Sequence, residues 1–414
     1  MVGNMAISFD PFSPEILANP YPHYQRLRDE APCYFVKRHQ LWVLSRYDDV
    51  VAALKNPTIF SSSGGVGPAW KSEPIMSMYD PPEHTRLRRL VAPFFTVGAM
   101  EAMGAAIEAN VERRMAPLLA SGTCELVEEL AIPVSLDVMA SVLGIQVEGH
   151  EQLRRWADAT TDQLAGGLEP ARAEEAKKDI VEFVAFLRAL LKDRRVNPDA
   201  PGVIGHLLSA ADTDALTARE QVAFCVLLLA AGWGTTAIGI ANTILALTEF
   251  PDQWALLQAQ TELLGNVSEE AIRYDGPIQS FFRNTLADVE FAGVTIPANS
   301  KVQILFGSAN RDERKFPNPD CFLIERATES HIGYGAGIHT CLGAPLARVA
   351  IAAVVRVCMR HVSDFKLAGT VERRPDVIFR TVAKLPLTMQ RRDISRGASI
   401  PPPTARRARA ATRR

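Results

Sequence analysis

The chain has 414 residues, of which 47% are hydrophobic and 22% are charged, and this composition predicts a soluble globular protein with a sizeable core. The formal net charge is −2, but residues 391–414 hold eight arginines and one aspartate, which leaves 37 basic and 46 acidic side chains in residues 1–390. Six scattered cysteines exclude a disulfide framework, and we expect no membrane span because no apolar run approaches the required length of about 20 residues.

We expect one large domain over residues 1–390, because no Gly/Ser-rich or Pro-rich linker precedes the C-terminal tail. The tail, residues 391–414, is rich in Pro, Ala and Arg and has no hydrophobic face, so it is predicted to be disordered. A solvated appendage is favoured over a segment that binds acidic partners, and no nucleic-acid partner is expected. The first residues lack the charged and apolar regions of a signal peptide, which favours a cytoplasmic protein.

The first part of the chain predicts a short helix, two strands and a second helix. A proline-marked entry opens a helix over residues 18–30, short strands are predicted over residues 33–36 and 41–45, and residues 47–54 show the apolar spacing of a helix. Residues 61–79 have no periodicity and many turn formers, so they predict a long loop. Long loops in compact domains are usually functional or disordered.

The next helix is predicted to begin after Asp80-Pro81-Pro82, because aspartate and proline suit a first helical turn. His84 and Arg88 lie four residues apart on this helix and therefore share one face. Without further context, this pattern indicates a surface pair.

Residues 97–247 are almost all helical in pattern. The helix predicted over residues 220–250 is mostly apolar but is interrupted at residues 230–236, which include Gly232 and Gly234. Each glycine in a helix interior costs about 1 kcal/mol relative to alanine. We therefore expect the helix to bend or open there and to leave space for a ligand or water. Close packing of another element against the glycines is the alternative.

A short helix that ends before Gly276 places Glu270 and Arg273 at positions i and i+3, where they can pair. A hairpin over residues 289–297 and a strand over residues 302–306 follow.

A glycine-rich stretch, residues 331–343, surrounds Cys341 and leads directly into an apolar helical pattern. Glycines at this density allow tight turns and a close approach to a flat group, and a helix N-terminus favours a thiolate. A dinucleotide loop fits poorly because Thr340 stands where the third glycine belongs, and a zinc site would need more ligands. A cysteine nucleophile with His339 as its base and a buried structural cysteine both stay open.

The order Tyr-Gly-x-Gly-x-His-x-Cys-x-Gly, which begins at Tyr334, resembles the haem-binding loop of the cytochrome P450 family, with tyrosine where phenylalanine is usual. This resemblance implies that Cys341 is the axial thiolate ligand of the haem iron. It also implies a set of further haem-binding residues, several of which are cations suited to the propionates: His84, Arg88, Arg283, His339, Tyr334 and Gly335. At least five motifs resemble the family in the proper order over residues 15–390.

The segment Ala231-Gly-x-x-Thr-Thr resembles the oxygen-binding part of the same family, in which Thr235 would hold dioxygen and its protons. Gly234 stands where the family has an acidic residue that relays protons, which places the usual relay in doubt. The resemblance further implies that Glu270, Arg273 and Arg326 form a buried structural cluster. Substrate-pocket positions are implied for Trp233, Ala230, Ile278, Phe281 and Phe282, with Val66, Trp70 and residues 379–386 as further candidates.

The resemblance implies a mainly α fold with a small β-region and a single haem domain that binds haem b. The implied activity is a monooxygenase that inserts one oxygen atom from O2 into a small organic substrate by hydroxylation, epoxidation or O-demethylation. Electrons would come from a ferredoxin and a ferredoxin reductase, because no flavin or iron–sulfur domain fits in the chain. Gly234 keeps open an enzyme for oxidative coupling, ring closure or peroxide-driven oxidation, and a non-catalytic haem protein is the third alternative.

Overall fold

The computed structural model describes residues 7–68, 75–145, 150–165, 169–194, 202–209, 216–327 and 330–392. Helices dominate these residues, as expected. The α-helices are α1 (Pro14–Ala18), α2 (Tyr21–Glu30), α3 (Tyr47–Leu54), α4 (Glu83–Val91), α5 (Val97–Ala102), α6 (Gly104–Ser121), α7 (Ile132–Leu143), α8 (His150–Ala165), α9 (Pro170–Arg194), α10 (Gly202–Ser209), α11 (Ala218–Glu249), α12 (Pro251–Ala259), α13 (Leu264–Asp275), α14 (Phe306–Ala309) and α15 (Ala344–His361).

The strands form small sheets, the largest of which has the order β1-β2-β8-β5-β3. Its strands β2 and β8 are parallel and its other pairs are antiparallel. The strands are β1 (Cys33–Val36), β2 (Leu41–Leu44), β3 (Phe60–Ser61), β4 (Thr123–Glu125), β5 (Ser280–Thr285), β6 (Val289–Phe291), β7 (Val294–Ile296), β8 (Lys301–Leu305), β9 (Val362–Leu367), β10 (Glu372–Arg373), β11 (Val382–Lys384) and β12 (Pro386–Arg391).

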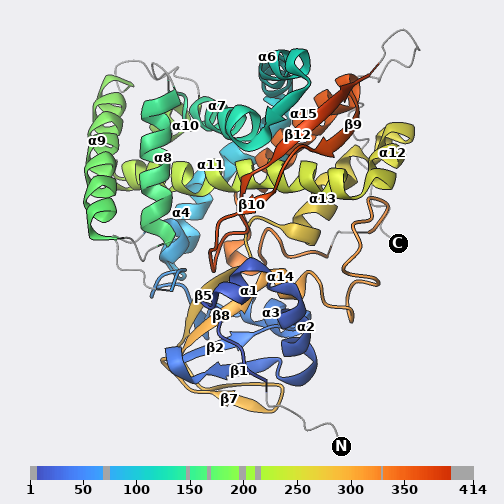
Figure 1. Cartoon of the computed structure of the whole chain (residues 1–414). Helices are drawn as coiled ribbons and strands as arrows, with labels where there is room; N and C mark the ends of the chain where they lie inside the picture. The colour runs from blue at the N-terminus through green and yellow to red at the C-terminus, as the bar shows by residue number, and fades with distance from the viewer. Residues whose placement is uncertain are drawn as a thin grey trace, which may run out of the picture.

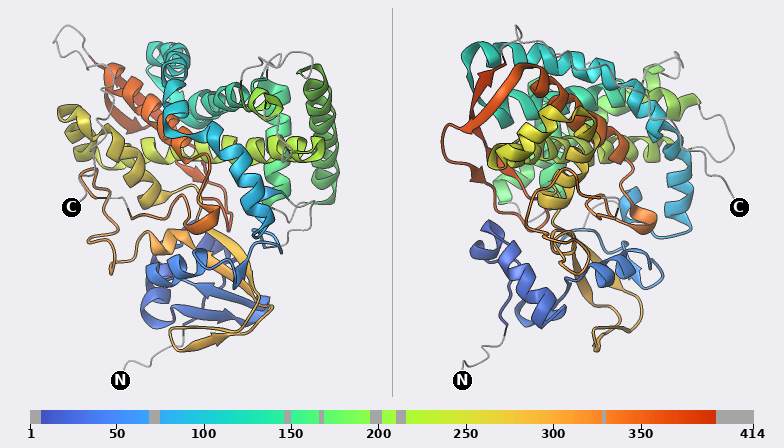
Figure 2. Two further views of the ribbon diagram at one scale, coloured as in Figure 1. Left: turned by 180° about the vertical axis from the view of Figure 1, so that it is seen from behind. Right: turned by 90° about the vertical axis from the view of Figure 1, so that its right-hand side faces the viewer.

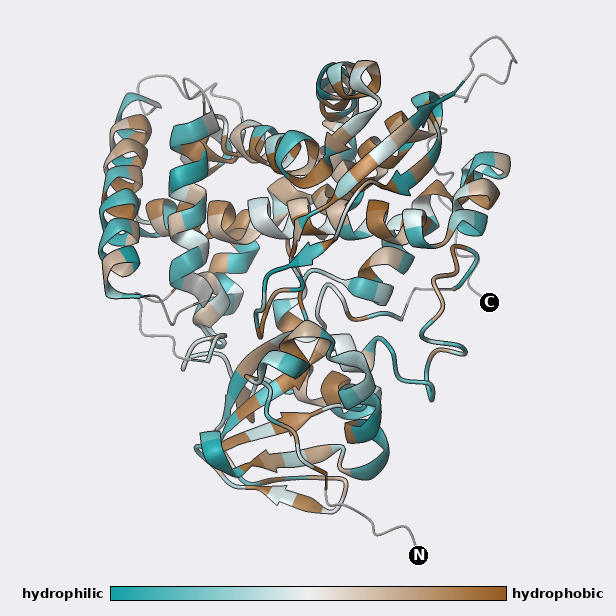
Figure 3. Cartoon of the chain, in the orientation of Figure 1, coloured by the Kyte–Doolittle hydropathy of each residue, from teal (hydrophilic) through white to brown (hydrophobic). Residues whose placement is uncertain are grey.

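The long helix α11 crosses the helical part of the molecule. The main sheet lies at the opposite end of the molecule, together with α1, α2 and α3 (Figure 1). Helices α8 and α9 stand side by side across one end of α11, and the view from behind agrees with this arrangement (Figure 2, left). Hydrophilic residues cover most of the visible face of α8 (Figure 3). The α8–α9 pair therefore forms an outer layer over α11.

Helix α11 begins with a capping box in which Thr217 and Glu220 each bond the backbone of the other. Most of its residues from Thr236 to Leu247 are buried, so tertiary packing stabilises its apolar sequence. Among the described residues, α11 is the one single helix long and apolar enough to cross a membrane, contrary to the expectation from the sequence. However, 61% of its most apolar window is buried by other elements, as in the core helix of a soluble protein.

Glu270 lies at the centre of a buried ion-pair cluster. Its carboxylate accepts hydrogen bonds from Arg273 Nε at 2.7 Å and Arg326 Nε at 3.1 Å, and the Leu323 N–H donates to it at 2.9 Å. The guanidinium of Arg273 also donates to backbone carbonyls of the segment that follows α14. The predicted pairing is confirmed, and it anchors α13 to the coiled segment that leads to the Cys341 loop.

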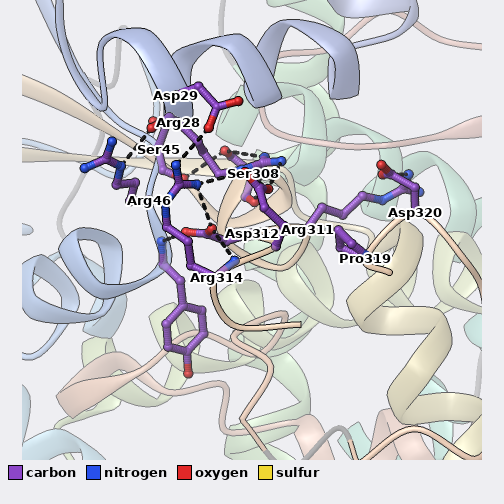
Figure 4. Close-up of polar contacts among 12 residues, drawn as sticks. Arg28, Asp29, Ser45, Arg46, Ser308, Arg311, Asp312, Arg314, Pro319 and Asp320 are labelled. Atoms are coloured by element: carbon purple, nitrogen blue, oxygen red, sulfur yellow. Dashed lines mark hydrogen bonds and ion pairs between the residues drawn. The ribbon is translucent and has the colours of Figure 1, made fainter. Parts of the chain in front are cut away.

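A second polar cluster joins α2 to the segment after α14 (Figure 4). The buried Arg28 donates to Ser308 and pairs with Glu313 at 3.0 Å, and Arg314 pairs with Asp29 at 2.8 Å. Asp312 accepts from Arg314 at 3.3 Å. This cluster holds the N-terminal helices against the long connection that precedes the Cys341 loop.

The C-terminal end of the fold differs from the prediction at its boundary. Arg391 belongs to β12, and the Arg392 N–H donates to the His361 carbonyl at 2.8 Å. The folded part therefore includes the first two residues of the predicted tail, because β12 pairs with both β4 and β9. The rest of that tail, residues 393–414, lies outside the described residues.

Candidate active site

The Cys341 loop is held in a tight shape by its own backbone and by glycines. The Cys341 N–H donates to the Tyr334 carbonyl at 2.8 Å, which closes the loop. Gly335 and Gly337 adopt left-handed φ angles of 75° and 72°, which favour glycine. A Cβ at Gly337 would also lie 2.4 Å from the Leu54 carbonyl oxygen. The loop thus requires glycine at 337 on two grounds, conformation and close approach to α3.

Cys341 lies just ahead of the N-terminus of α15, and its surface is accessible although protein atoms surround it densely. Burial raises the pKa of the Cys341 thiol, whereas hydrogen bonds from the Gly343 and Ala344 N–H groups and the charge of Arg88 act to lower it. The pKa as a whole is raised. The sulfur therefore has the amide donors that suit a metal-bound thiolate.

Four basic side chains from separate segments gather near this loop: His84 and Arg88 on α4, Arg283 on β5, and His339 in the loop. The rings of His84 and His339 lie 4.3 Å apart between centroids. The His339 Nε2 atom lies 3.1 Å from the Ser62 hydroxyl, and Arg283 donates to the Phe282 carbonyl at 2.7 Å. Ser62 was not identified from the sequence, because nothing in its loop marks it as a partner of His339.

These basic groups form no ion pair with a carboxylate among the described residues, although Asp80 lies near enough to raise the pKa of Arg283 and His84 against the effect of burial. Among the described residues, no carboxylate forms an ion pair with Arg88 or Arg283, and the buried Nδ1 atom of His84 has no hydrogen-bond partner. Burial lowers the pKa of Arg283 to about 10. Burial and the charges of Arg283, His84 and Arg88 lower the pKa of His339 to about 3. A buried basic cluster of this kind fits a ligand that carries two carboxylates, such as the propionates of haem.

The segment of α11 predicted to bend or open belongs to one continuous helix, Ala218–Glu249, so the expected opening is not found there. The two glycines explain how the helix stays regular. A Cβ at Gly232 would lie 2.5 Å from the Met139 sulfur on α7, so this glycine allows close packing. A Cβ at Gly234 would meet nothing within 4 Å. Gly232 thus serves helix packing, which was the alternative from the sequence, and Gly234 leaves open space.

Open space also borders the turn that precedes Thr235. Ala231 is exposed, although Ala230 before it and Trp233 after it are buried. The Thr235 hydroxyl donates to the Ala231 carbonyl at 2.7 Å and is half-buried. The sequence named Ala231 only as the first residue of the oxygen-binding segment and gave it no role, although its spacing of four residues from Thr235 places both on one helix face.

The pocket residues predicted from the sequence fall into two groups. Ile278, Phe281 and Phe282 lie together where β5 meets Phe379, and Phe282 is only 1% exposed. Ala230 lies buried on α11, one turn before Gly234. The apolar cluster that holds Phe282 and Phe379 also includes Val66 and Ile238. Ile238 follows Gly234 by four residues on α11. Ile238 was not predicted from the sequence, although its spacing of four residues from Gly234 places both on one helix face. Trp70 lies outside the described residues.

Trp233 differs from its predicted place in the substrate pocket. Its indole N–H donates to the Ala157 carbonyl at 3.0 Å and to the Thr161 hydroxyl at 2.9 Å, both on α8. The ring is 7% exposed and thus packs into the contact between α11 and α8. We therefore remove Trp233 from the candidate pocket.

A separate polar pocket of about 370 Å³ lies between α2, the end of α13 and β10, and does not include Cys341 or Thr235. Its charged groups largely neutralise each other, since Asp275 pairs with Arg373 at 2.7 Å and with Arg380 at 3.3 Å. Arg311 lies between the rings of Tyr21 and Tyr274. This pocket is therefore not the candidate active site.

The family model described as Cytochrome P450 matches residues 169–388. The chain belongs to the cytochrome P450 family. It is 33% identical to cytochrome P450 CYP199A2 of Rhodopseudomonas palustris over 92% of this chain and 94% of that protein. It is also 33% identical to the cytochrome P450 monooxygenase PikC of Streptomyces venezuelae, over 91% of this chain and 92% of that one.

Solved structures agree with this assignment. The structure of CalO2 matches with a TM-score of 0.86 and 30% identity, over 92% of this chain and 99% of that chain. Cytochrome P450 CYP109Q5 from Chondromyces apiculatus matches with a TM-score of 0.84 and 33% identity, over 93% and 98%. The predicted P450 fold is confirmed. As a bacterial-type P450, this chain is an oxidoreductase that uses haem b and O2, acts as a monooxygenase on small organic substrates and receives electrons from redox partners.

Proposed function

We propose that Cys341 ligates the haem iron and that His84, Arg88, Arg283 and His339 hold the haem propionates. The observation that carries this proposal is the buried basic cluster, which lacks carboxylate partners among the described residues, beside a cysteine with amide donors. Tyr334 and Gly335 shape the loop under the cofactor. The haem domain extends through β12 to Arg392.

Haem b supplies the chemistry that activates dioxygen and transfers one oxygen atom to the substrate. Thr235 Oγ1 is the proton-holding atom of this chain, since its hydroxyl is half-exposed beside Ala231 and bonds the Ala231 carbonyl at 2.7 Å. Gly234 provides no acid, so a water molecule or a polar group of the substrate in the space beside it completes the proton path.

The substrate that fits this site is uncharged and largely apolar. Ala230, Ile278, Phe281, Phe282 and Ile238 present only hydrophobic side chains. Hydrophobic pockets of this kind orient a ligand mainly through its shape and apolar area. A solved relative with 29% identity and a TM-score of 0.81, CYP109E1 from Bacillus megaterium, is in complex with testosterone, so testosterone is a suitable first probe.

The electron donors in this proposal are a ferredoxin and its reductase, and the enzyme acts in the cytoplasm. The described residues form one haem-type domain and hold no second domain that could carry a flavin. In this proposal, electrons arrive through a transient contact with these partner proteins. Reduction by NADH in the presence of both partners, compared with either partner alone, tests this requirement.

The carbon monoxide difference spectrum of the reduced protein tests the ligand assignment. We expect a strongly red-shifted Soret band that Cys341→Ala abolishes and that Cys321→Ala, a substitution of another exposed cysteine, leaves unchanged. Unchanged haem ligation in Cys341→Ala would refute the proposal.

A second function is favoured by one observation, the open space and missing acid at Gly234. An enzyme with this feature could carry out oxidative coupling, ring closure or peroxide-driven oxidation. Product formation supported by peroxide but not by NADH and the redox partners would favour this second function over conventional oxygen insertion.

A further inference from the structure

Trp233 connects three helices at the residue next to Gly234 and Thr235. Its indole N–H reaches Ala157 and Thr161 on α8, as described above, and its backbone carbonyl accepts a hydrogen bond from the Ser135 hydroxyl on α7 at 2.5 Å. All of these groups are buried. A buried hydrogen bond is directional, so the three contacts fix both the ring and the peptide of Trp233.

The acceptor on α8 is itself part of a local network. The Ala157 carbonyl also accepts from the Thr160 hydroxyl at 2.8 Å and from the Thr161 hydroxyl at 3.0 Å. Hydroxyl groups that bond a carbonyl one turn earlier distort a helix slightly and turn that carbonyl outward. Trp233 therefore bonds to α8 through two acceptors, the Ala157 carbonyl and the Thr161 hydroxyl.

The turn that carries the oxygen-site residues has little support of its own. A side chain is missing at Gly234, where nothing lies within 4 Å of a built Cβ, and the Thr235 hydroxyl bonds only within α11. Gly232 lets α7 approach but adds no contact from a side chain. Among the described residues, the side-chain hydrogen bonds that join the turn from Ala231 to Thr235 to other helices are therefore those at Trp233.

We propose that Trp233 is a positioning residue that couples α8 to the turn Ala231–Thr235, so that the placement of the Thr235 hydroxyl follows the placement of α8. This inference rests on the proposed role of Thr235 as the proton-holding residue. Trp233, which lies outside the pocket, would thereby affect how much of the NADH consumed yields product and how much yields peroxide.

Hydrogen–deuterium exchange of the haem-loaded protein, measured on backbone amides, tests the coupling directly. Trp233→Phe keeps the aromatic ring but removes the donor. We expect it to speed exchange by about tenfold in peptides from both α8 and the turn Ala231–Thr235, because a lost buried hydrogen bond favours local opening by about this factor. Thr161→Val approaches the same contact from α8 and is expected to give a smaller change in both places.

A matched control is Trp156→Phe, since Trp156 also lies on α8 but packs against Phe183 of α9 with ring centroids 5.0 Å apart. We expect it to affect exchange mainly where α9 faces α8, with a much smaller effect on the turn Ala231–Thr235 than Trp233→Phe, because the hydrogen bonds of Trp233 to Ala157 and Thr161 stay in place. If Trp233→Phe does not load haem, Thr161→Val still tests the contact from the other helix.

A second readout is the peroxide released per NADH consumed with ferredoxin, its reductase and testosterone as the probe. We expect Trp233→Phe to raise this ratio by about threefold to tenfold without a matching change in testosterone affinity, because a small misplacement of a catalytic group reduces the chemical step strongly. Unchanged exchange in the turn would overturn the coupling. Faster exchange with an unchanged ratio, together with an unchanged ratio in Thr235→Ala, would instead overturn the proposed role of Thr235.

Discussion

Two glycines that lie two residues apart on α11 are expected to respond in opposite directions to the same substitution. In a helix interior, Gly→Ala stabilises by about 1 kcal/mol when the methyl group has room. Gly234→Ala meets this condition because nothing lies within 4 Å of the added Cβ. We therefore expect Gly234→Ala to raise the free energy of unfolding by about 1 kcal/mol.

At Gly232 the same methyl group would lie 2.5 Å from the Met139 sulfur and 2.8 Å from its terminal carbon. Met139 is only 2% exposed, so the flexible end of its side chain would have to repack inside the contact between α7 and α11. Overpacking of a buried site costs about 1–3 kcal/mol, which outweighs or cancels the helix-propensity gain of about 1 kcal/mol. We expect Gly232→Ala to be less stable than Gly234→Ala by about 1–3 kcal/mol.

Urea titration of the haem-loaded variants, followed by tryptophan fluorescence, measures the difference. A double-mutant cycle identifies its cause, because Gly232→Ala in a Met139→Ala background no longer meets the colliding atoms. In that background the substitution is expected to stabilise about as much as Gly234→Ala. If Gly232→Ala is as stable as Gly234→Ala in the parent, contact with Met139 does not explain the glycine.

Three further predictions concern charge. Gly234→Asp is expected to fit without displacing a neighbour and to lower the peroxide released per NADH, and an unchanged ratio would show that water already serves as the relay. Arg283→Leu is expected to weaken haem retention in a transfer assay to apomyoglobin, by at least about tenfold for a charge-assisted contact, whereas unaltered retention would remove Arg283 from the propionate site. Burial raises the pKa of Glu269, but His331 and Arg348 outweigh this effect and hold it at about 2, below its ordinary value of 4.5. Because the folded state has the lower pKa, Glu269 contributes stability above pH 4.5 that is lost as the pH falls toward 2, and Glu269→Gln should flatten the dependence of unfolding on pH in that range.

Much of the candidate site follows from the sequence because its motifs are local. The glycines around Cys341 and the pair His84 and Arg88 each occupy one short segment, and a resemblance carried by short motifs can place them. The approach of β5 to α4 and the loop is not local, so the sequence alone could not bring Arg283 to His339. Nothing in the residues by themselves predicts that Arg283 lies near enough to His339 to lower its pKa.

The sequence failed where packing decided between two outcomes. Glycines in a helix interior predict bending, yet α11 stays regular because α7 closes on Gly232 and because surrounding elements bury most of the helix. Trp233 was assigned to the pocket from its neighbours in sequence, although one residue of rotation on a helix, about 100°, turns a side chain toward a different partner. Only the position of α8 reveals that partner.

Two groups of arginines lie inside this fold. Those in one group pair with carboxylates and stabilise the fold, and those in the other form no ion pair and lie at the candidate active site. Arg273 and Arg326 share Glu270, and Arg28 pairs with Glu313, so these buried charges are balanced by carboxylates that the chain itself supplies. Arg283 is buried and Arg88 is half-buried, yet no carboxylate among the described residues forms an ion pair with either. A buried unpaired cation costs several kcal/mol, and a folded chain retains it when the compensating charge arrives with a ligand. Arg273 shows that this fold can place a carboxylate beside a buried arginine. The lack of an ion pair at Arg88 and Arg283 among the described residues is therefore a structural argument for an anionic cofactor at this site.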